Sequence, residues 1–134
     1  MYPETAISAI FPQNEGKPAF TVTLPKDQKS LTVPLSIYFF HLDFRENHQI
    51  IFEITNLDTD KNLPPVTFEL KGQPEYSIGA VNSQLDYNLI FDLPEDIPDH
   101  SSFALKAILQ GGQVNTTSHP VTYFDLRKTH GVWS

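Results

Sequence analysis

The feature that most constrains this chain is a regular alternation of apolar and polar residues. In the segment 86–93 every second residue is apolar, and the segment 101–110 repeats the pattern. Neighbouring side chains of a β-strand point to opposite faces, so a period of two is typical of strands with one buried face. We find no amphipathic helix pattern of convincing length. The sequence therefore predicts an all-β protein.

Similar segments recur along the whole chain between residues that favour turns. The predicted strands cover 6–11, 19–24, 31–44, 48–57, 65–71, 76–81, 86–93, 101–110 and 113–126. The eleven prolines suit strand ends and turns better than helices. Short strands at this spacing predict an antiparallel β-sandwich of about seven to nine strands. The 134 residues show no internal linker, so we expect a single domain over residues 1–134.

Two features predict details of the last strands. Gly111-Gly112 is typical of a two-residue hairpin turn, because both central positions of such a turn favour positive φ. This turn would pair Leu109 with Val114, apolar against apolar. Pro120 lies within the last predicted strand and has no N–H for the ladder, which predicts an edge or a bulge.

A resemblance to a known superfold covers residues 86–126. Immunoglobulin-like domains often open their strand F with Asp-x-Gly/Ala/Ser-x-Tyr-x-Cys. Asp99, Ser101, Phe103 and Leu105 stand at the matching positions, and a hairpin turn follows. The stretch therefore resembles strands E, F and G of an immunoglobulin-like β-sandwich. A fold of this kind implies no particular activity.

The chain departs from that pattern at several positions. Phe103 replaces the tyrosine, so the hydroxyl of a tyrosine corner is missing, and Leu105 replaces the cysteine. The only tryptophan is Trp133 near the end, so the usual buried tryptophan of strand C is absent. We expect Phe52 to fill that space.

Net charge and cysteine content exclude several classes of protein. The net charge of -7 argues against nucleic-acid binding, which needs Lys and Arg, and against anionic membrane surfaces. No cysteine is present, which excludes disulfides, thiolate metal sites and cysteine nucleophiles. The first residues lack the basic and apolar regions of a signal peptide. Together these observations lead us to expect a cytoplasmic protein.

Motifs for catalysis are also missing. The sequence contains no Gly-x-Ser-x-Gly elbow and no phosphate-binding glycine loop. His41, Asp43 and His48 are the types of residue that bind zinc. However, His41 and His48 belong to different predicted strands and are expected to lie on different faces. We therefore predict neither an enzyme nor a cofactor.

The stretch NLDTDKN resembles the start of a calcium loop. Asp58, Asp60 and Asn62 match the first three ligand positions of an EF-hand, and Glu69 matches the last. Leu63 stands where the sharp turn of that loop needs glycine, and the flanking segments are strands. An EF-hand is therefore not expected here.

A second calcium geometry would use carboxylates from two loops at one end of the sandwich. The candidate ligands are Asp58, Asp60, Glu95, Asp96 and Asp99. The two loops share an end only if residues 65–81 form one strand, kinked at residues 72–74, or cross between the sheets. Otherwise the loops lie at opposite ends. The alternative interpretation is an Asx-rich turn with solvated charges.

The sequence thus favours a non-catalytic binding or structural module that acts through protein–protein contacts. Near the C-terminus, Arg127, Lys128 and His130 form a basic patch, and Trp133 is a type of residue found at binding hot spots. Arg127, Lys128 and Trp133 are the candidate contacts for a protein partner or for self-association. The alternative interpretation of this segment is a frayed tail. The alternative function is a calcium- or carbohydrate-binding β-sandwich that uses the acidic loops. Calcium is the only cofactor that we consider.

Overall fold

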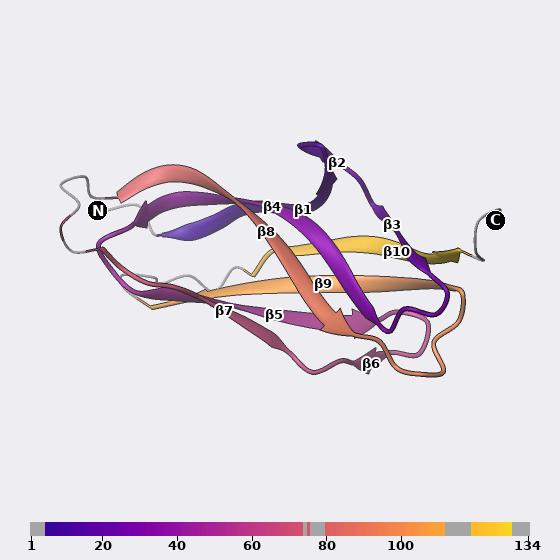
Figure 1. The fold of residues 1–134 in the computed structure, drawn as a ribbon. Helices are drawn as coiled ribbons and strands as arrows, with labels where there is room; N and C mark the ends of the chain where they lie inside the picture. The colour runs from indigo at the N-terminus through magenta and orange to yellow at the C-terminus, as the bar shows by residue number, and fades with distance from the viewer. Residues whose placement is uncertain (1–4, 74, 76–79, 112–118, 130–134) are drawn as a thin grey trace.

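A computed structural model describes residues 5–73, 75, 80–111 and 119–129, and these residues form two packed β-sheets (Figure 1). The described part contains no helix that could span a membrane. It contains ten strands, of which two have only two residues. The strands are β1 (Ala6–Asn14), β2 (Lys17–Pro18), β3 (Thr21–Pro25), β4 (Ser30–Asp43), β5 (His48–Asn56), β6 (Lys61–Asn62), β7 (Val66–Leu70), β8 (Ala80–Asp92), β9 (His100–Gln110) and β10 (Val121–Thr129).

The front sheet has the strand order β2-β1-β4-β8, and the back sheet has the order β3-β10-β9-β5-β6, with β7 also paired to β5. All the pairs are antiparallel except β3 with β10, which is parallel. The prediction of an all-β, immunoglobulin-like sandwich is confirmed. The parallel pair was not predicted, because it joins strands from the two ends of the chain.

The core lies between the sheets, where the inward positions of both are apolar. Phe52 is fully buried, as predicted, and its ring stacks on Tyr87 at 5.5 Å. Phe103, at the position of the missing tyrosine, is also fully buried and stacks on Phe124 at 5.3 Å. Full burial of one such side chain contributes about 1.5–3 kcal/mol. Phenylalanine rings thus replace both the tryptophan and the tyrosine of the superfold pattern.

β4 contains a bulge that the sequence pattern did not show. The register between β4 and β8 shifts at this point, and His41 has φ of 54°, in the left-handed region. Tyr38 and Phe40 remain exposed, but Leu42 turns into the core, where it is 1% exposed. A strict period of two would place Leu42 on the same face as Tyr38 and Phe40. The extra residue of the bulge reverses that assignment.

The last strands differ from the prediction in two ways. The predicted segments 76–81 and 86–93 are joined into the single strand β8 where the structure describes them. The last strand is β10, which begins at Val121 and not at residue 113. The predicted hairpin at Gly111-Gly112, with its partner Val114, lies outside the described residues beyond Gly111.

Candidate functional site

The first half of β10 lacks a neighbour on one side. β3 pairs only with Asp125–Thr129, whereas β9 pairs with the strand from Val121 onward. Within the described part of the chain, no strand pairs with the other edge of residues 121–124. Pro120 predicted that the last strand lies at an edge of the sheet. This is correct for residues 121–124 of β10. It is wrong for Asp125–Thr129, which pair with β3, a partner that was not predicted.

The hydrogen bonds around β10 show which residues face the free edge. Asp125 N donates to Phe20 O at 2.8 Å, on the side of β3. Backbone groups of alternate residues point the same way in an antiparallel ladder. Val121 and Tyr123 therefore direct their N–H and C=O groups toward the unpaired side.

Exposed apolar side chains surround this free edge. Phe20 is 53% exposed, Val121 is 42% exposed and Tyr123 is 58% exposed. They border a hollow of about 310 Å³, which we call the β10 hollow. Its lining residues are Phe20, Val121, Thr122, Tyr123, Phe124 and Asp125. Backbone groups without a partner and apolar surface thus occur at the same place.

The predicted basic patch is only partly assembled at this strand. Arg127 is exposed on β10 and, by the period of two, lies on the same outward face as Tyr123. Lys128 instead donates from Nζ to Ile97 O at 3.0 Å, which holds the loop after β8. Trp133 lies outside the described residues. The sequence did not predict that Phe20 is exposed. Phe20 is two residues from Val22, which faces inward, so the period of two predicts an inward position for Phe20 as well.

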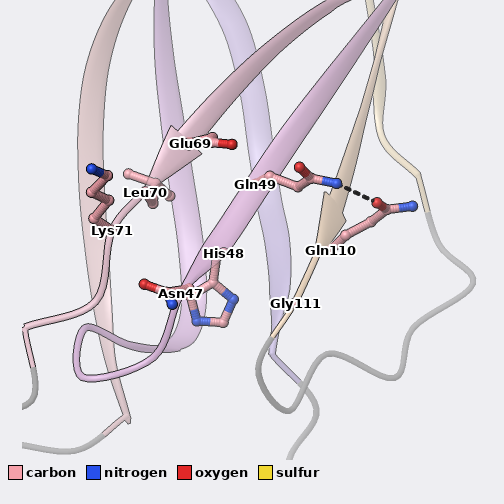
Figure 2. A pocket seen from close by; sticks show the side chains of 8 residues that line it. All are labelled: Asn47, His48, Gln49, Glu69, Leu70, Lys71, Gln110 and Gly111. Carbon is pink, nitrogen blue, oxygen red and sulfur yellow. Dashed lines mark hydrogen bonds between the residues drawn. The ribbon is translucent and has the colours of Figure 1, made fainter.

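A larger pocket of about 530 Å³ lies where β5, β7 and β9 meet at one end of the back sheet (Figure 2). His48 is only 5% exposed, its Nε2 lies 3.3 Å from Asp43 O, and its Nδ1 has no hydrogen-bond partner among the residues that the structure describes. Gln49 Nε2 donates to Gln110 Oε1 at 2.7 Å (Figure 2). The described lining residues are Asn47, His48, Gln49, Glu69, Leu70, Lys71, Gln110 and Gly111. None of them has a hydroxyl or thiol group to act as a nucleophile with His48.

The turn beside this pocket is held by an ion pair. Arg45 donates from Nε and Nη2 to the two carboxylate oxygens of Asp43, at 3.0 and 2.8 Å. These hydrogen bonds, together with one from Arg45 N, lower the pKa of Asp43 from its ordinary 3.8 to about 2. The same contact raises the pKa of Arg45. His41 stacks on Phe40 at 3.9 Å. Among the described residues, His41, Asp43 and His48 do not form a group that is placed to hold a metal ion.

The two acidic loops do lie at the same end of the sandwich. β7 returns along β5, and the chain then crosses to the front sheet as β8, which satisfies the condition for a shared end. Ser102 N, just after the second loop, donates to Asp58 Oδ2 at 3.1 Å. Glu95 lies 4.0 Å from Lys29 Nζ.

The shared end does not gather the five candidate calcium ligands into a cluster. Among the described residues, no group of three or more His, Asp or Glu side chains is placed to hold an ion. Asp60, Asp96 and Asp99 are all described, so the absence of such a group applies to them as well. Calcium binding at these residues stays a prediction.

Comparison with known proteins gives a likeness in fold only. The chain matches no protein-family model. It also matches no curated protein sequence. Among solved structures it is similar to the periplasmic chaperone SfaE, with 17% sequence identity and a TM-score of 0.43. The match covers 96% of this chain and 59% of the chaperone chain, so the chain spans less than two thirds of that protein's length.

This comparison contradicts the predicted cytoplasmic location, because the similar structure is that of a periplasmic protein. The prediction rested on the missing cysteines and on the composition of the first residues. Neither decides the compartment. An immunoglobulin-like core packed with phenylalanine, as here around Phe52 and Phe103, needs no disulfide and is equally compatible with an oxidising environment.

Proposed function

We propose that this protein is a non-catalytic binding module that takes up an extended segment of a partner protein at the β10 hollow. The observation that supports this proposal is the coincidence of a free strand edge with exposed apolar side chains. Extended peptides commonly bind by adding a strand to an unpaired sheet edge. In that mode the backbone supplies affinity and neighbouring side-chain pockets supply specificity.

The backbone of β10 is suited to this role over a short length. Val121 and Tyr123 each direct one N–H and one C=O to the free side. An added strand would continue the line of β3, which already occupies the same edge opposite Asp125–Thr129. The free stretch thus accepts a segment of a few residues.

The side chains beside the edge would supply specificity. Tyr123 offers a large ring with few rotatable bonds, a type of residue that is frequent among binding hot spots. The ring of Phe20, the residue directly before β3, borders the same hollow. We expect an apolar side chain of the partner to occupy the hollow, while Arg127 on the same face favours an acidic neighbour.

A display library of random linear peptides tests this proposal. We expect enriched peptides to bind the wild-type protein and to bind Tyr123→Ala about fivefold more weakly or worse, because an interfacial hot-spot ring contributes more than 1 kcal/mol. Val121→Pro should weaken them as well, since it removes an N–H that faces the free edge and leaves the bonds to β9 intact. Peptide affinity is measured by isothermal titration calorimetry.

The matched control is Tyr38→Ala, which removes an exposed ring from the other sheet and should leave peptide affinity unchanged. Thermal unfolding of each variant verifies that the fold is retained. The proposal is wrong if the library yields no specific peptide, or if enriched peptides bind Tyr123→Ala and Val121→Pro as tightly as the wild type.

A further inference from the structure

Four aromatic side chains gather on the outer face of the front sheet, on the side of the molecule opposite to the back sheet. They are Phe11 of β1 and Tyr38, Phe40 and His41 of β4, and we call them the aromatic patch. Tyr38 is 37% exposed and Phe40 is 36% exposed, while Phe11 and His41 are partly exposed. β1 and β4 are neighbours in the sheet (Figure 1), and the contact between the rings of Phe11 and Tyr38 joins the two strands.

The four rings are arranged in two stacked pairs. Phe11 and Tyr38 have ring centroids 5.9 Å apart, with 28° between the ring planes. Phe40 and His41 have centroids 3.9 Å apart, with 10° between the planes. Stacking of this kind fixes the orientation of rings that would otherwise move freely at a surface.

The bulge in β4 is what makes the second pair possible. Phe40 and His41 are consecutive, so in a regular strand they would point to opposite faces. The left-handed conformation of His41 places both rings outside, at a cost of about 1–2 kcal/mol for a residue other than glycine. Thr5 Oγ1 donates to His41 O at 2.8 Å, and His41 N donates to Asn82 Oδ1 at 3.1 Å. Strained residues held in this way are concentrated at binding sites.

The surroundings of the patch are polar and hold few charged groups. Asn82 and Gln84 of β8 border it with amide groups, and Gln13 follows Phe11 on the same face of β1. The carboxylate of Asp86 accepts hydrogen bonds from Ser36 Oγ and from Gln84 Nε2, at 3.2 and 3.1 Å. Lys17 of β2 is the only Lys or Arg in the described strands of this sheet. A phosphate group would thus find few cations here, and the low charge of the face suits a neutral ligand.

We propose that the aromatic patch binds a neutral polysaccharide chain. Pyranose rings present flat C–H faces that pack against aromatic rings, and their hydroxyl groups both donate and accept hydrogen bonds. The stacked rings supply the first contact, and the bordering amides, each with donors and an acceptor, supply the second. A sheet face with rings along one strand fits an extended chain. This site lies on the sheet opposite to the β10 hollow and is independent of the function proposed above.

The test uses affinity electrophoresis and titration calorimetry with soluble neutral glycans: a β-1,4-glucan, a β-1,3-glucan, a xylan and an α-glucan. We expect retention of the wild-type protein by at least one of them. Tyr38→Ala and Phe40→Ala should each lower the association constant about tenfold, the loss typical of removing a ring from a binding contact. Tyr123→Ala, which removes a still more exposed ring from the back sheet, should leave glycan affinity unchanged.

His41→Gly separates binding from folding. Glycine adopts the left-handed conformation without strain, so this variant should melt at the same temperature as the wild type or higher, yet bind the glycan more weakly. The proposal is overturned if none of the glycans retains the protein at millimolar sugar concentration. It is also overturned if retention is the same in Tyr38→Ala, Phe40→Ala and His41→Gly, or if these variants lose binding to display-library peptides in place of glycans.

Discussion

The two ends of the sandwich differ in how closely their connecting loops pack. Side-chain oxygens accept backbone N–H hydrogen bonds at both ends, and where β4 turns into β5 they do so from Arg45 N to Asp43 and from Gly72 N to Asn47. At the end where β4 turns into β5, which we call the turn end, backbone packs directly on backbone. A Cβ atom added to Gly72 would lie 2.5 Å from Arg45 O, and one added to Gly111 would lie 2.5 Å from Asn47 O. The turn thus lies against two glycines that leave no space for a side chain.

At the opposite end, which we call the acidic end, polar side chains satisfy the backbone. Asn56 Oδ1 accepts hydrogen bonds from Asp58 N and Thr59 N, at 2.9 and 3.4 Å. Asp58 Oδ2 accepts from Ser102 N, and Leu57 N donates to Ser102 O at 2.8 Å. Carboxylates and amides that look like metal ligands in sequence are here partners of backbone N–H groups. The same residue types serve both purposes, because both need an oxygen acceptor.

The largest expected effect is at the turn end. Gly111→Ala should lower the free energy of unfolding by about 2–4 kcal/mol, because the methyl group meets Asn47 O and because φ is 97° there. Gly16→Ala is the matched control, since Gly16 also has positive φ but nothing within 4 Å of its Cβ position. Urea unfolding of both variants measures the difference. Equal losses in the two variants would show that close packing against Asn47 contributes nothing.

An intermediate effect is expected at the acidic end. Asp58→Ala should lower the free energy of unfolding by about 1 kcal/mol, through loss of the hydrogen bond to Ser102 N. Asp96→Ala, at an exposed position in the second acidic loop, should change it by less than about 0.5 kcal/mol. We expect millimolar calcium to leave the melting temperature unchanged. A rise with calcium that disappears in Asp58→Ala would instead make these carboxylates ligands.

The smallest effect concerns the Asp43–Arg45 pair, and it should depend on pH. The pKa of Asp43 is lowered in the folded protein, so its ionised form stabilises the fold at pH values above 3.8, and this contribution is lost as the pH falls toward 2. Asp43→Asn should therefore be less stable than the wild type near neutral pH, and the gap should close as the pH falls from about 3.8 toward 2. Urea midpoints at several pH values measure the gap.

Glu95→Gln provides the control for that experiment. Glu95 and its partner Lys29 are 4.0 Å apart, and their side chains are 90% and 80% exposed. Exposed ion pairs contribute little to stability. The urea midpoint of Glu95→Gln should therefore equal that of the wild type at every pH. If Asp43→Asn behaves in the same way as Glu95→Gln, the pair at the turn end has no stabilising role.

Sequence pattern predicts the parts of this fold that repeat with a constant period. The inward positions of β9 and the burial of Phe52 follow from the alternation alone, and so does the class of the fold. The bulge at His41 could not be found in this way, because one extra residue shifts the period without any change in composition. The pairing of β3 with β10 was missed because it depends on contacts between the two ends of the chain.

The candidate sites were harder to predict for a related reason. Asp58 and Ser102 meet only because β7 and β8 place the two acidic loops at one end of the sandwich. From the sequence alone, it was open whether these loops share an end or lie at opposite ends. The β10 hollow exists because the pairing of β3 with β10 begins only at Thr21, opposite Asp125. Tyr123 lies within the last predicted strand, but its free backbone edge follows from the length of a strand far away in the sequence.

The parallel pairing of β3 with β10 also has a consequence for the order of folding. Thr21 pairs with Asp125, so β3 is synthesised well before its partner and must wait for β10 before its ladder can form. Loop-closure entropy has to be overcome before such a distant contact gives any stabilisation, which makes folding slow. During synthesis β3 is therefore an unpaired strand, exposed to other chains. Thr21 and Thr23 place polar side chains on that strand, and Pro25 lacks the N–H that another chain could pair with, which limits wrong pairing until β10 is made.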